Sequence, residues 1–561
     1  MDKRTILAIV LSLAVLMIYQ MFFLKPPPPR QPLPDQKTGE PAAKQQAAEK
    51  VAPPADAVYS GTTLLQTVAG GEKDVQVETP LYRAVFTTRG GALKSFQLKG
   101  YYRTLPPDRL YHSPDFLSIF KQKDTAPPSP DAALPIEMVH LREGMPRPLG
   151  IAFPESSVNI PQEGVYESDA GRLEIAKGGE GQRLTFFQVH KGRIKVEKIY
   201  TFHPDKFSFD LEVRLTNFSA APLSENINLS WYQYIDPKTD ADQDGHRGPI
   251  TSAVQTIDRQ EVAKIETEKI LGPDVSWSGF EDKYFIASMI PRNPSLTTAV
   301  VSRDARNMVS VSLRGPKDVI PPGQTGLFSY SLYLGPKDYN LLKALGVGLQ
   351  DAVDFGSILK WLAMPLLLAL KFLYHYVHNY GIAIIILTIL IKILFWPLGN
   401  KSYKAMKEMQ KLQPKIQELQ QKYKDDKQKL GQETMALYKT HHVNPLGGCL
   451  PMLIQIPVFF GLYKSLLFAI ELRHSPFFWW IQDLSAKDPY YITPIIMGAT
   501  MFIQQKMSPP MGDPMQAKIM MWMPVIFTFM FLNFSSGLVI YWLFNNILSI
   551  GQQYYINKKS S

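Results

Sequence analysis

One lysine inside a long apolar segment restricts this chain more than any other feature. Lys392 lies in a mostly apolar run from Gly381 to Leu398, which is long enough to cross a bilayer as a helix. A charge at that depth is costly, so it usually faces a polar cavity or a functional path. Snorkelling of its stem to the inner interface is the alternative, because Lys392 lies only about 9 Å along the helix from Leu398.

Polar residues in other apolar segments favour the cavity over snorkelling. Thr388 lies one helical turn from Lys392, Gln455 lies between two prolines of another segment, and Tyr541 shares a face with Asn545 in the last one. Each is an ordinary contact between membrane helices when it occurs alone, worth about 0.6 kcal/mol. Together these polar residues surround a lysine that has no evident acidic partner. They predict a water-filled, positively charged groove in a membrane bundle.

Loop charges predict the topology of that bundle. The segment from Lys401 to Lys439 carries ten lysines and five acidic residues, so we expect it in the cytoplasm together with the basic N-terminus and the C-terminus. Six crossings satisfy every loop, and the later ones are short, at roughly 22 Å against about 30 Å of hydrocarbon. The predicted ranges are an uncleaved anchor at 1–25, spans at 381–398, 446–470, 491–506, 517–533 and 536–556, and a short cytoplasmic tail at 557–561.

The segment 357–378 is predicted to lie in the membrane interface as an amphipathic helix. Lys360, Lys371 and two histidines gather on one side of it, and Pro365 interrupts its middle. Counting this segment as a crossing would place the lysine-rich loop outside the cell, against the charge rule.

The lysine-rich loop itself is predicted to form a cytoplasmic helical hairpin at 399–443. Apolar residues recur at spacings of three or four from Tyr403 to Tyr423, and a turn follows at 424–427. The net charge of +10 is therefore concentrated beside the membrane, which suits anionic lipids or a ribosome better than recognition of a specific nucleic-acid sequence. The candidate partner-binding residues are Lys401, Lys404, Lys407, Lys411, Lys415, Lys422, Lys424 and Lys427.

The first three fifths of the chain has a different pattern. Residues 26–58 form a Pro/Ala-rich stretch that cannot bury a core, and we expect a disordered linker there. From 59 to 340 the chain alternates apolar and polar residues, most strictly at 207–215, which predicts a large antiparallel β-sandwich on the periplasmic side.

No catalytic residue, metal site or cofactor is predicted in the β domain. The acidic turn at 240–245 begins like a calcium loop, but Thr251 occupies the twelfth position, where a glutamate is needed. The aromatic residues at 231–234 are better explained as strand core than as a platform for a sugar ring. The single cysteine, Cys449, lies in the membrane half, so the β domain has no disulfide.

Three long motifs resemble the YidC/Oxa/Alb family of membrane insertases. They are Asn444 to Pro457 (NPLGGCLPMLIQIP), the stretch DLSAKDPYYITPIIMGATMFIQQKMSP and the stretch MPVIFTFMFLNFSSGLVIYW. The resemblance covers the whole chain, including the anchor and the large periplasmic domain of Gram-negative members.

The resemblance implies an insertase of the bacterial inner membrane that uses no nucleotide. Its five-helix core would hold a groove open to cytoplasm and lipid, and its β domain would be a supersandwich without a catalytic set. Lys392 occupies the position of the usual groove arginine, while Thr388, Tyr541 and Trp542 match substrate-contacting positions, the second of which is usually tyrosine. The implied partners are nascent membrane proteins, the Sec translocon, ribosomes and targeting factors.

Two other functions fit parts of the sequence. A transporter or channel would use Lys392 as an intramembrane counter-charge, although no inverted repeat is visible. A carbohydrate-active periplasmic enzyme with a membrane anchor would need an acid/base constellation that the β domain does not show.

Overall fold

The computed structural model describes residues 71–103, 105, 134–154, 160–191, 193–236, 245–356, 359–424, 426–441, 443, 450–507 and 514–559. The predicted anchor, the predicted linker, the acidic turn at 240–244 and the motif residues 444–449 with Cys449 lie outside these ranges.

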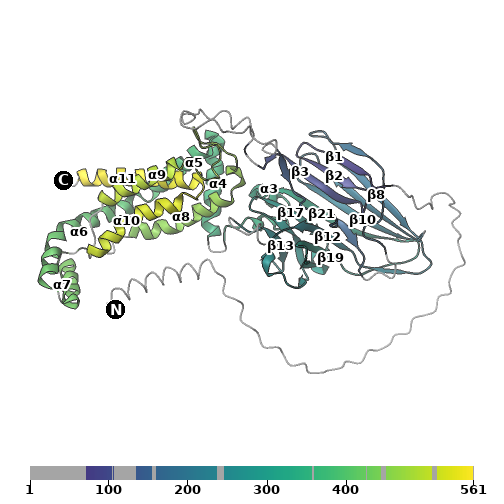
Figure 1. Cartoon of the computed structure of the whole chain (residues 1–561), viewed down its shortest axis with the longest axis horizontal. Helices are drawn as coiled ribbons and strands as arrows, with labels where there is room; N and C mark the ends of the chain where they lie inside the picture. The colour runs from purple at the N-terminus through teal and green to yellow at the C-terminus, as the bar shows by residue number, and fades with distance from the viewer. Residues whose placement is uncertain are drawn as a thin grey trace, which may run out of the picture. The chain divides into compact units, whose positions relative to one another are not determined.

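Two groups of strands build a β-sandwich (Figure 1). A nine-stranded sheet packs against a five-stranded sheet through Phe96 and Phe209, and a second five-stranded sheet contacts its other half. The long sheet runs β14 (Thr256–Arg259), β13 (Gly248–Ala253), β16 (Val275–Glu281), β17 (Phe285–Pro291), β21 (Thr325–Pro336), β10 (Ser208–Asn217), β9 (Ile194–Phe202), β8 (Gln182–His190), β6 (Glu167–Ser168).

The smaller sheets complete the β domain. Their pairings are antiparallel except for β1 with β7, which is parallel. They run β4 (Pro135–Glu137), β3 (Ala92–Tyr102), β2 (Tyr82–Thr87), β1 (Asp74–Glu78), β7 (Arg172–Glu174); then β15 (Lys269–Leu271), β18 (Thr298–Arg303), β19 (Met308–Arg314), β12 (Asn228–Tyr234), β5 (Gly150–Ala152); and β11 (Leu223–Glu225) with β20 (Asp318–Ile320). Short 3-10 turns are η2 (Val262–Lys264), η3 (Pro294–Leu296), η4 (Leu349–Ala352) and η6 (Ile470–Leu472).

The alternation seen in the sequence places the core of the sandwich. In β10, Phe209, Leu211 and Val213 are fully buried, while the residues between them are partly exposed. Trp231 of β12 is also fully buried, as expected for strand core, whereas Tyr232 and Tyr234 are only partly buried. One side of each strand is therefore fixed by burial of apolar area.

Lys198 of β9 is an exception to this apolar core. Its side chain is fully buried, and its Nζ donates to the carbonyl oxygens of Gly90 at 3.0 Å and Leu149 at 2.6 Å. Because burial disfavours the charged form, the pKa of Lys198 falls to about 7.

Lys198 predicts a pH-dependent contribution to stability. An unfolded lysine holds its proton up to about pH 10.4, so between pH 7 and that value the unfolded state binds more protons and the folded state gains stability as pH rises. From pH 7 to pH 9 the wild-type chain should gain about 2 kcal/mol relative to Lys198→Met. Chemical denaturation of both proteins at the two pH values measures this difference, and parallel pH profiles would contradict it.

The C-terminal part is helical (Figure 1). The helices α8, α9, α10 and α11 run side by side, and α6 and α7 extend from the end at which the C-terminus lies. The helices are α3 (Tyr339–Ala344), α4 (Lys360–Val377), α5 (Tyr380–Leu394), α6 (Trp396–Lys422), α7 (Lys427–Thr440), α8 (Leu450–Phe468), α9 (Ile492–Met507), α10 (Pro514–Phe531) and α11 (Ser536–Lys559).

Local sequence signals set several helix ends. Asn379 caps α5 by accepting from the backbone N–H of Ile382, and Asp426 caps α7 by accepting from that of Lys429. The run predicted as one helix at 381–398 is divided, because α5 ends at Leu394 and α6 begins at Trp396 with a bend of 65°. Pro397 in the first turn of α6 suits a new helix start. The predicted tail also differs, since α11 continues to Lys559.

Close contacts between small residues hold the bundle together. The hydroxyl of Ser465 in α8 donates to the carbonyl of Ala363 in α4 at 2.6 Å. A Cβ added to Gly498 of α9 would lie 2.0 Å from Thr528 Oγ1, so α9 and α10 approach more closely than any larger residue allows. Helix α4 thus packs one face on the bundle and exposes Trp361 and Phe372 on the other.

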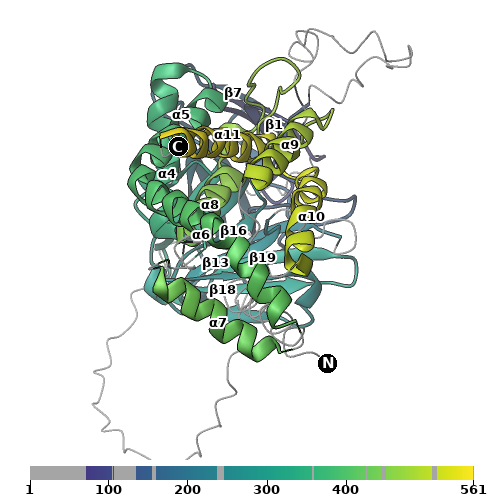
Figure 2. The same ribbon diagram turned by 90° about the vertical axis from the view of Figure 1, so that its left-hand side faces the viewer.

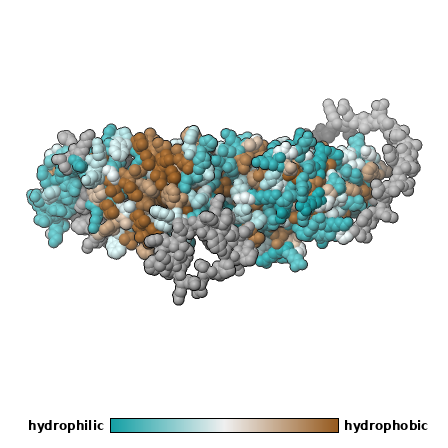
Figure 3. Space-filling model, turned by 90° about the horizontal axis from the view of Figure 1, so that it is seen from above, coloured by the Kyte–Doolittle hydropathy of each residue, from teal (hydrophilic) through white to brown (hydrophobic). Residues whose placement is uncertain are grey.

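Hydrophobic residues gather on the outside of the helices. Figure 3 shows them as a band beside the hydrophilic end of the molecule. No single helix within the described ranges is both long and apolar enough to cross a membrane, whereas α5 and α6 meet that condition as a bent pair. The stretches 455–468 of α8 and 521–531 of α10 are shorter apolar helices.

Candidate functional site

Lys392 contacts a neutral hydroxyl instead of a carboxylate. Its Nζ donates to Ser549 Oγ of α11 at 2.7 Å, and its side chain is half-buried. Among the residues that the structure describes, no Asp or Glu forms an ion pair with it. A cation on a helix of this hydrophobicity is therefore held by a neutral oxygen within the part of the chain that the structure describes.

A row of polar side chains along α11 surrounds this contact. Tyr541, Asn545, Ser549 and Gln552 recur every three or four residues and share one side of the helix. Gln455 of α8 donates to Asn545 Oδ1 at 2.7 Å, and Gln552 donates to the side-chain oxygen of Asn400 in α6 at 3.0 Å. The structure therefore brings Lys392, Gln455 and Asn545 into one polar network.

Thr388 and Tyr541 are placed differently. Thr388 is 1% exposed, and its hydroxyl donates to the carbonyl of Ile384 in its own helix at 2.7 Å. Tyr541 is also 1% exposed, and its ring lies against Phe459. Neither side chain presents a free surface, so any contact with a substrate requires the helices around them to separate.

Trp542 belongs to an aromatic cluster at one end of the polar row. Its ring contacts Phe459 of α8 with centroids 4.7 Å apart, and Phe531 of α10 with centroids 5.2 Å apart. Figure 2, seen from the end at which α7 lies, shows α8 and α10 on either side of the region below α9 and α11. The cluster therefore joins these two helices across α11.

Two members of the network, Ser549 and Tyr403, were not predicted as site residues from the sequence. Ser549 lies four residues after Asn545, a spacing that signals the same helix face. Tyr403 belongs to the apolar periodicity of the predicted hairpin, yet its side chain interacts with Ser549 and Gln504. Helix α6 therefore reaches the site as well as the hairpin.

The candidate partner-binding lysines are mostly exposed along α6. Met409, Leu412 and Ile416 are buried on the opposite side, which leaves the basic side free. Lys411 pairs with Glu408, and Lys407 donates to the backbone of Asn557 at 3.3 Å. The exposed members are Lys401, Lys404, Lys411, Lys415, Lys422 and Lys424, whereas the side chain of Lys427 lies outside the described part.

An ion cluster lies at the end of the bundle opposite to α6 and α7. Lys371 of α4 bridges Asp338 at 2.9 Å and Glu471 at 2.7 Å. Burial alone would raise the pKa of Asp338, but the hydrogen bond and charge of Lys371 outweigh it and lower that pKa. For Glu471 burial is the larger effect, and its pKa is raised. The predicted polar stripe of α4 is thus partly used inside the protein.

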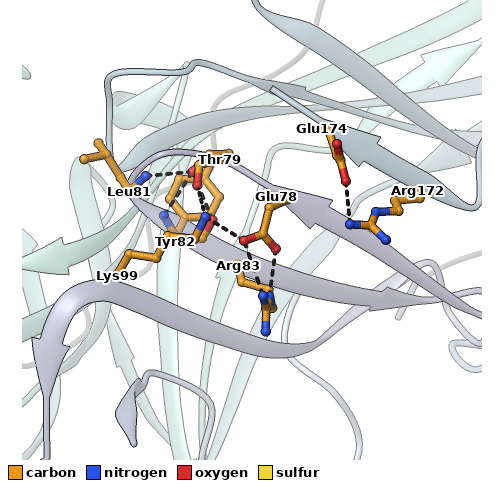
Figure 4. Close-up of polar contacts among 8 residues, drawn as sticks. All are labelled: Glu78, Thr79, Leu81, Tyr82, Arg83, Lys99, Arg172 and Glu174. Atoms are coloured by element: carbon orange, nitrogen blue, oxygen red, sulfur yellow. Dashed lines mark hydrogen bonds and ion pairs between the residues drawn. The ribbon is translucent and has the colours of Figure 1, made fainter. Parts of the chain in front are cut away.

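The β domain carries polar clusters that are internally paired. Figure 4 shows Glu78 held by Arg83 at 2.7 Å and by Lys99 at 2.6 Å, beside Thr79, whose hydroxyl donates to the carbonyl of Tyr82. Arg172 pairs with Glu174 on the neighbouring strand β7. The contacts of Glu78 and Thr79 fix the turn between β1 and β2.

Comparison with known proteins places the chain among relatives along its whole length. Residues 372–561 match the family described as 60Kd inner membrane protein, and residues 142–369 match the YidC periplasmic domain. The chain is 62% identical over 568 positions to the membrane protein insertase YidC of Syntrophus aciditrophicus (strain SB), with 100% of both chains covered.

A second curated relative and one solved structure are also similar to the chain. The membrane protein insertase YidC of Geobacter metallireducens is 40% identical, covering 100% of this chain and 98% of that protein. The crystal structure of an active YidC insertase with its first transmembrane domain resolved is similar at 18% identity and a TM-score of 0.37, covering 87% of this chain and 94% of that chain.

Proposed function

Because the chain belongs to the YidC family of membrane protein insertases, we propose that it admits the polar end of a nascent membrane protein to a groove built around Lys392. The chain is an inner-membrane protein with a periplasmic β-sandwich and a helical C-terminal region, and it acts as an insertase rather than as an enzyme.

The contact of Lys392 with Ser549 carries this proposal. The ammonium is held at 2.7 Å by a neutral oxygen, so its charge is not cancelled within the described residues. A short acidic or polar tail of a client gains electrostatic stabilisation there that lipid does not offer. Gln455 and Asn545 extend the polar surface along α8 and α11 and supply hydrogen-bonding partners to the backbone of the tail.

Partition of the client helix into lipid provides the driving force. Each strongly apolar residue contributes roughly 0.3–0.6 kcal/mol when it enters the hydrocarbon. The aromatic cluster of Phe459, Phe531 and Trp542 supports a groove that is closed on the side away from α6. For the client helix to leave the groove between α8 and α10, these rings must separate, and their separation uncovers Tyr541.

The finer topology and the partners are part of the proposal. Six crossings with both termini in the cytoplasm agree with the C-terminus and the α6–α7 hairpin lying at the same end of the bundle. The exposed lysines of α6 suit anionic lipid headgroups and the surface of a ribosome. We propose that the hairpin receives ribosomes and targeting factors, and that the Sec translocon works with this protein on larger clients.

Reconstitution tests this function. Liposomes that contain only the purified chain should insert a short single-spanning client with an acidic tail, measured as protection of that tail from added protease. Empty liposomes should leave the tail accessible. A transporter or channel would instead produce flux of a trapped dye or ion without protecting the client, and that result would overturn the proposal.

A further inference from the structure

The hydroxyl of Ser549 is the point at which several elements meet. Ser549 is 3% exposed, and its Oγ donates to the carbonyl of Asn545 at 2.7 Å while it accepts from Lys392 Nζ at 2.7 Å. A hydroxyl has one proton and two lone pairs. Since the proton is used within α11, both lone pairs remain for donors from other helices.

Tyr403 supplies the second donor. Its side chain interacts with Ser549 and with Gln504 of α9. Because the proton of Ser549 is used within α11, its remaining lone pair can accept from the Tyr403 hydroxyl. Ser549 therefore interacts with α5 and α6 as well as with its own helix.

This arrangement determines where the charge of Lys392 lies. A lysine side chain is long and flexible, and on a helix of a membrane protein it would otherwise extend to the nearest aqueous interface. One N–H of the ammonium is bound to Ser549, which leaves its other two N–H groups to bind an anion.

We propose that Ser549 is a positioning residue: it holds the ammonium of Lys392 inside the polar network in a fixed direction, with Tyr403 of α6 holding Ser549 in turn. The role of this residue in insertion rests on the proposed function. The position of the ammonium does not, and the two are measured separately.

The first measurement is the rate at which a small water-soluble amine-reactive ester acylates Lys392 in nanodiscs, read by mass spectrometry. Ser549→Ala frees the ammonium and should raise this rate several-fold, while Ser549→Thr keeps the hydroxyl and should restore the wild-type rate. Tyr403→Phe, which removes one oxygen, should give a smaller rise. Ser465→Ala is the matched control, because that buried hydroxyl also bonds within its helix but contacts α4 instead of Lys392.

The second measurement is insertion of the acidic-tailed client. Ser549→Ala should reduce the insertion rate about tenfold, since hydrogen bonds to charged groups are among the stronger ones. In a Lys392→Met background the same change should have no further effect, whereas a merely structural role would still lower the rate.

The outcomes separate the two claims. Unchanged acylation of Lys392 in both Ser549→Ala and Tyr403→Phe overturns the positioning role, whatever insertion shows. Normal insertion by Lys392→Met alone overturns the proposed function and leaves the acylation result standing.

Discussion

Replacing Lys392 with glutamate should lower the insertion rate of an acidic-tailed client about a hundredfold. At an effective dielectric constant of 20, a charge pair about 5 Å apart is worth roughly 3 kcal/mol, and the substitution turns this attraction into repulsion. Lys392→Arg keeps the charge and adds a planar group that binds carboxylates well, so it should insert at least as fast as wild type. Initial rates of tail protection in proteoliposomes give the comparison.

The client provides the control for this prediction. When the acidic residues of its tail are replaced by their amides, the difference between Lys392→Glu and Lys392→Arg should largely disappear, since no charge remains to be attracted or repelled. Equal rates of the two variants with the acidic tail would show that the groove does not act electrostatically.

Replacing Lys371 with methionine should lower the free energy of unfolding by about 3 kcal/mol, because breaking a buried ion pair leaves an uncompensated charge. Lys371 is the cation between Asp338 and Glu471, and all three side chains are at most 20% exposed. Denaturation of the full chain in detergent, followed by the fluorescence of its tryptophans, measures the loss.

Two variants on the same surface check the cause. Adding Glu471→Gln to Lys371→Met removes one of the orphaned charges and should recover part of the loss. Lys360→Met breaks the pair with Asp351, whose partners are 44% and 40% exposed, and should cost at most about 1 kcal/mol. If Lys360→Met and Lys371→Met were equally destabilising, the ion cluster would have no special role.

The same cluster has a defined pH dependence. Since the pKa of Asp338 is lowered on folding, its contribution is complete above its ordinary pKa near 3.9 and is lost as the pH falls below it. The contribution of Asp338 is therefore present throughout the neutral range.

Sequence periodicity alone was sufficient to predict the features that depend on residues close together along the chain. The alternation at 207–215 gave the buried face of β10, because a strand has a period of two. Gln455 and Asn545 are recognisable from the sequence because each lies in an apolar segment, where a polar side chain needs a partner, and they are partners of each other.

Features that depend on distant segments were not predictable. The contact between Lys392 and Ser549 joins positions 157 residues apart, and the Asp338, Lys371 and Glu471 cluster joins three separate elements. Thr388 lies one turn from Lys392, but a threonine hydroxyl in a helix readily bonds its own backbone, as it does here with Ile384. A helical wheel shows which way a side chain points, but it does not show which residues of other segments that side chain contacts.

Hydration at position 392 tests the central claim most directly. In a Cys449→Ser background a nitroxide is attached to Lys392→Cys, and in a second protein to Leu390→Cys, whose native side chain is 50% exposed on the outside of α5. Deuterium modulation of the electron spin echo in nanodiscs made with heavy water reports contact with solvent. We expect strong modulation at 392 and almost none at 390; equally weak modulation at both sites would contradict a water-filled groove around this lysine.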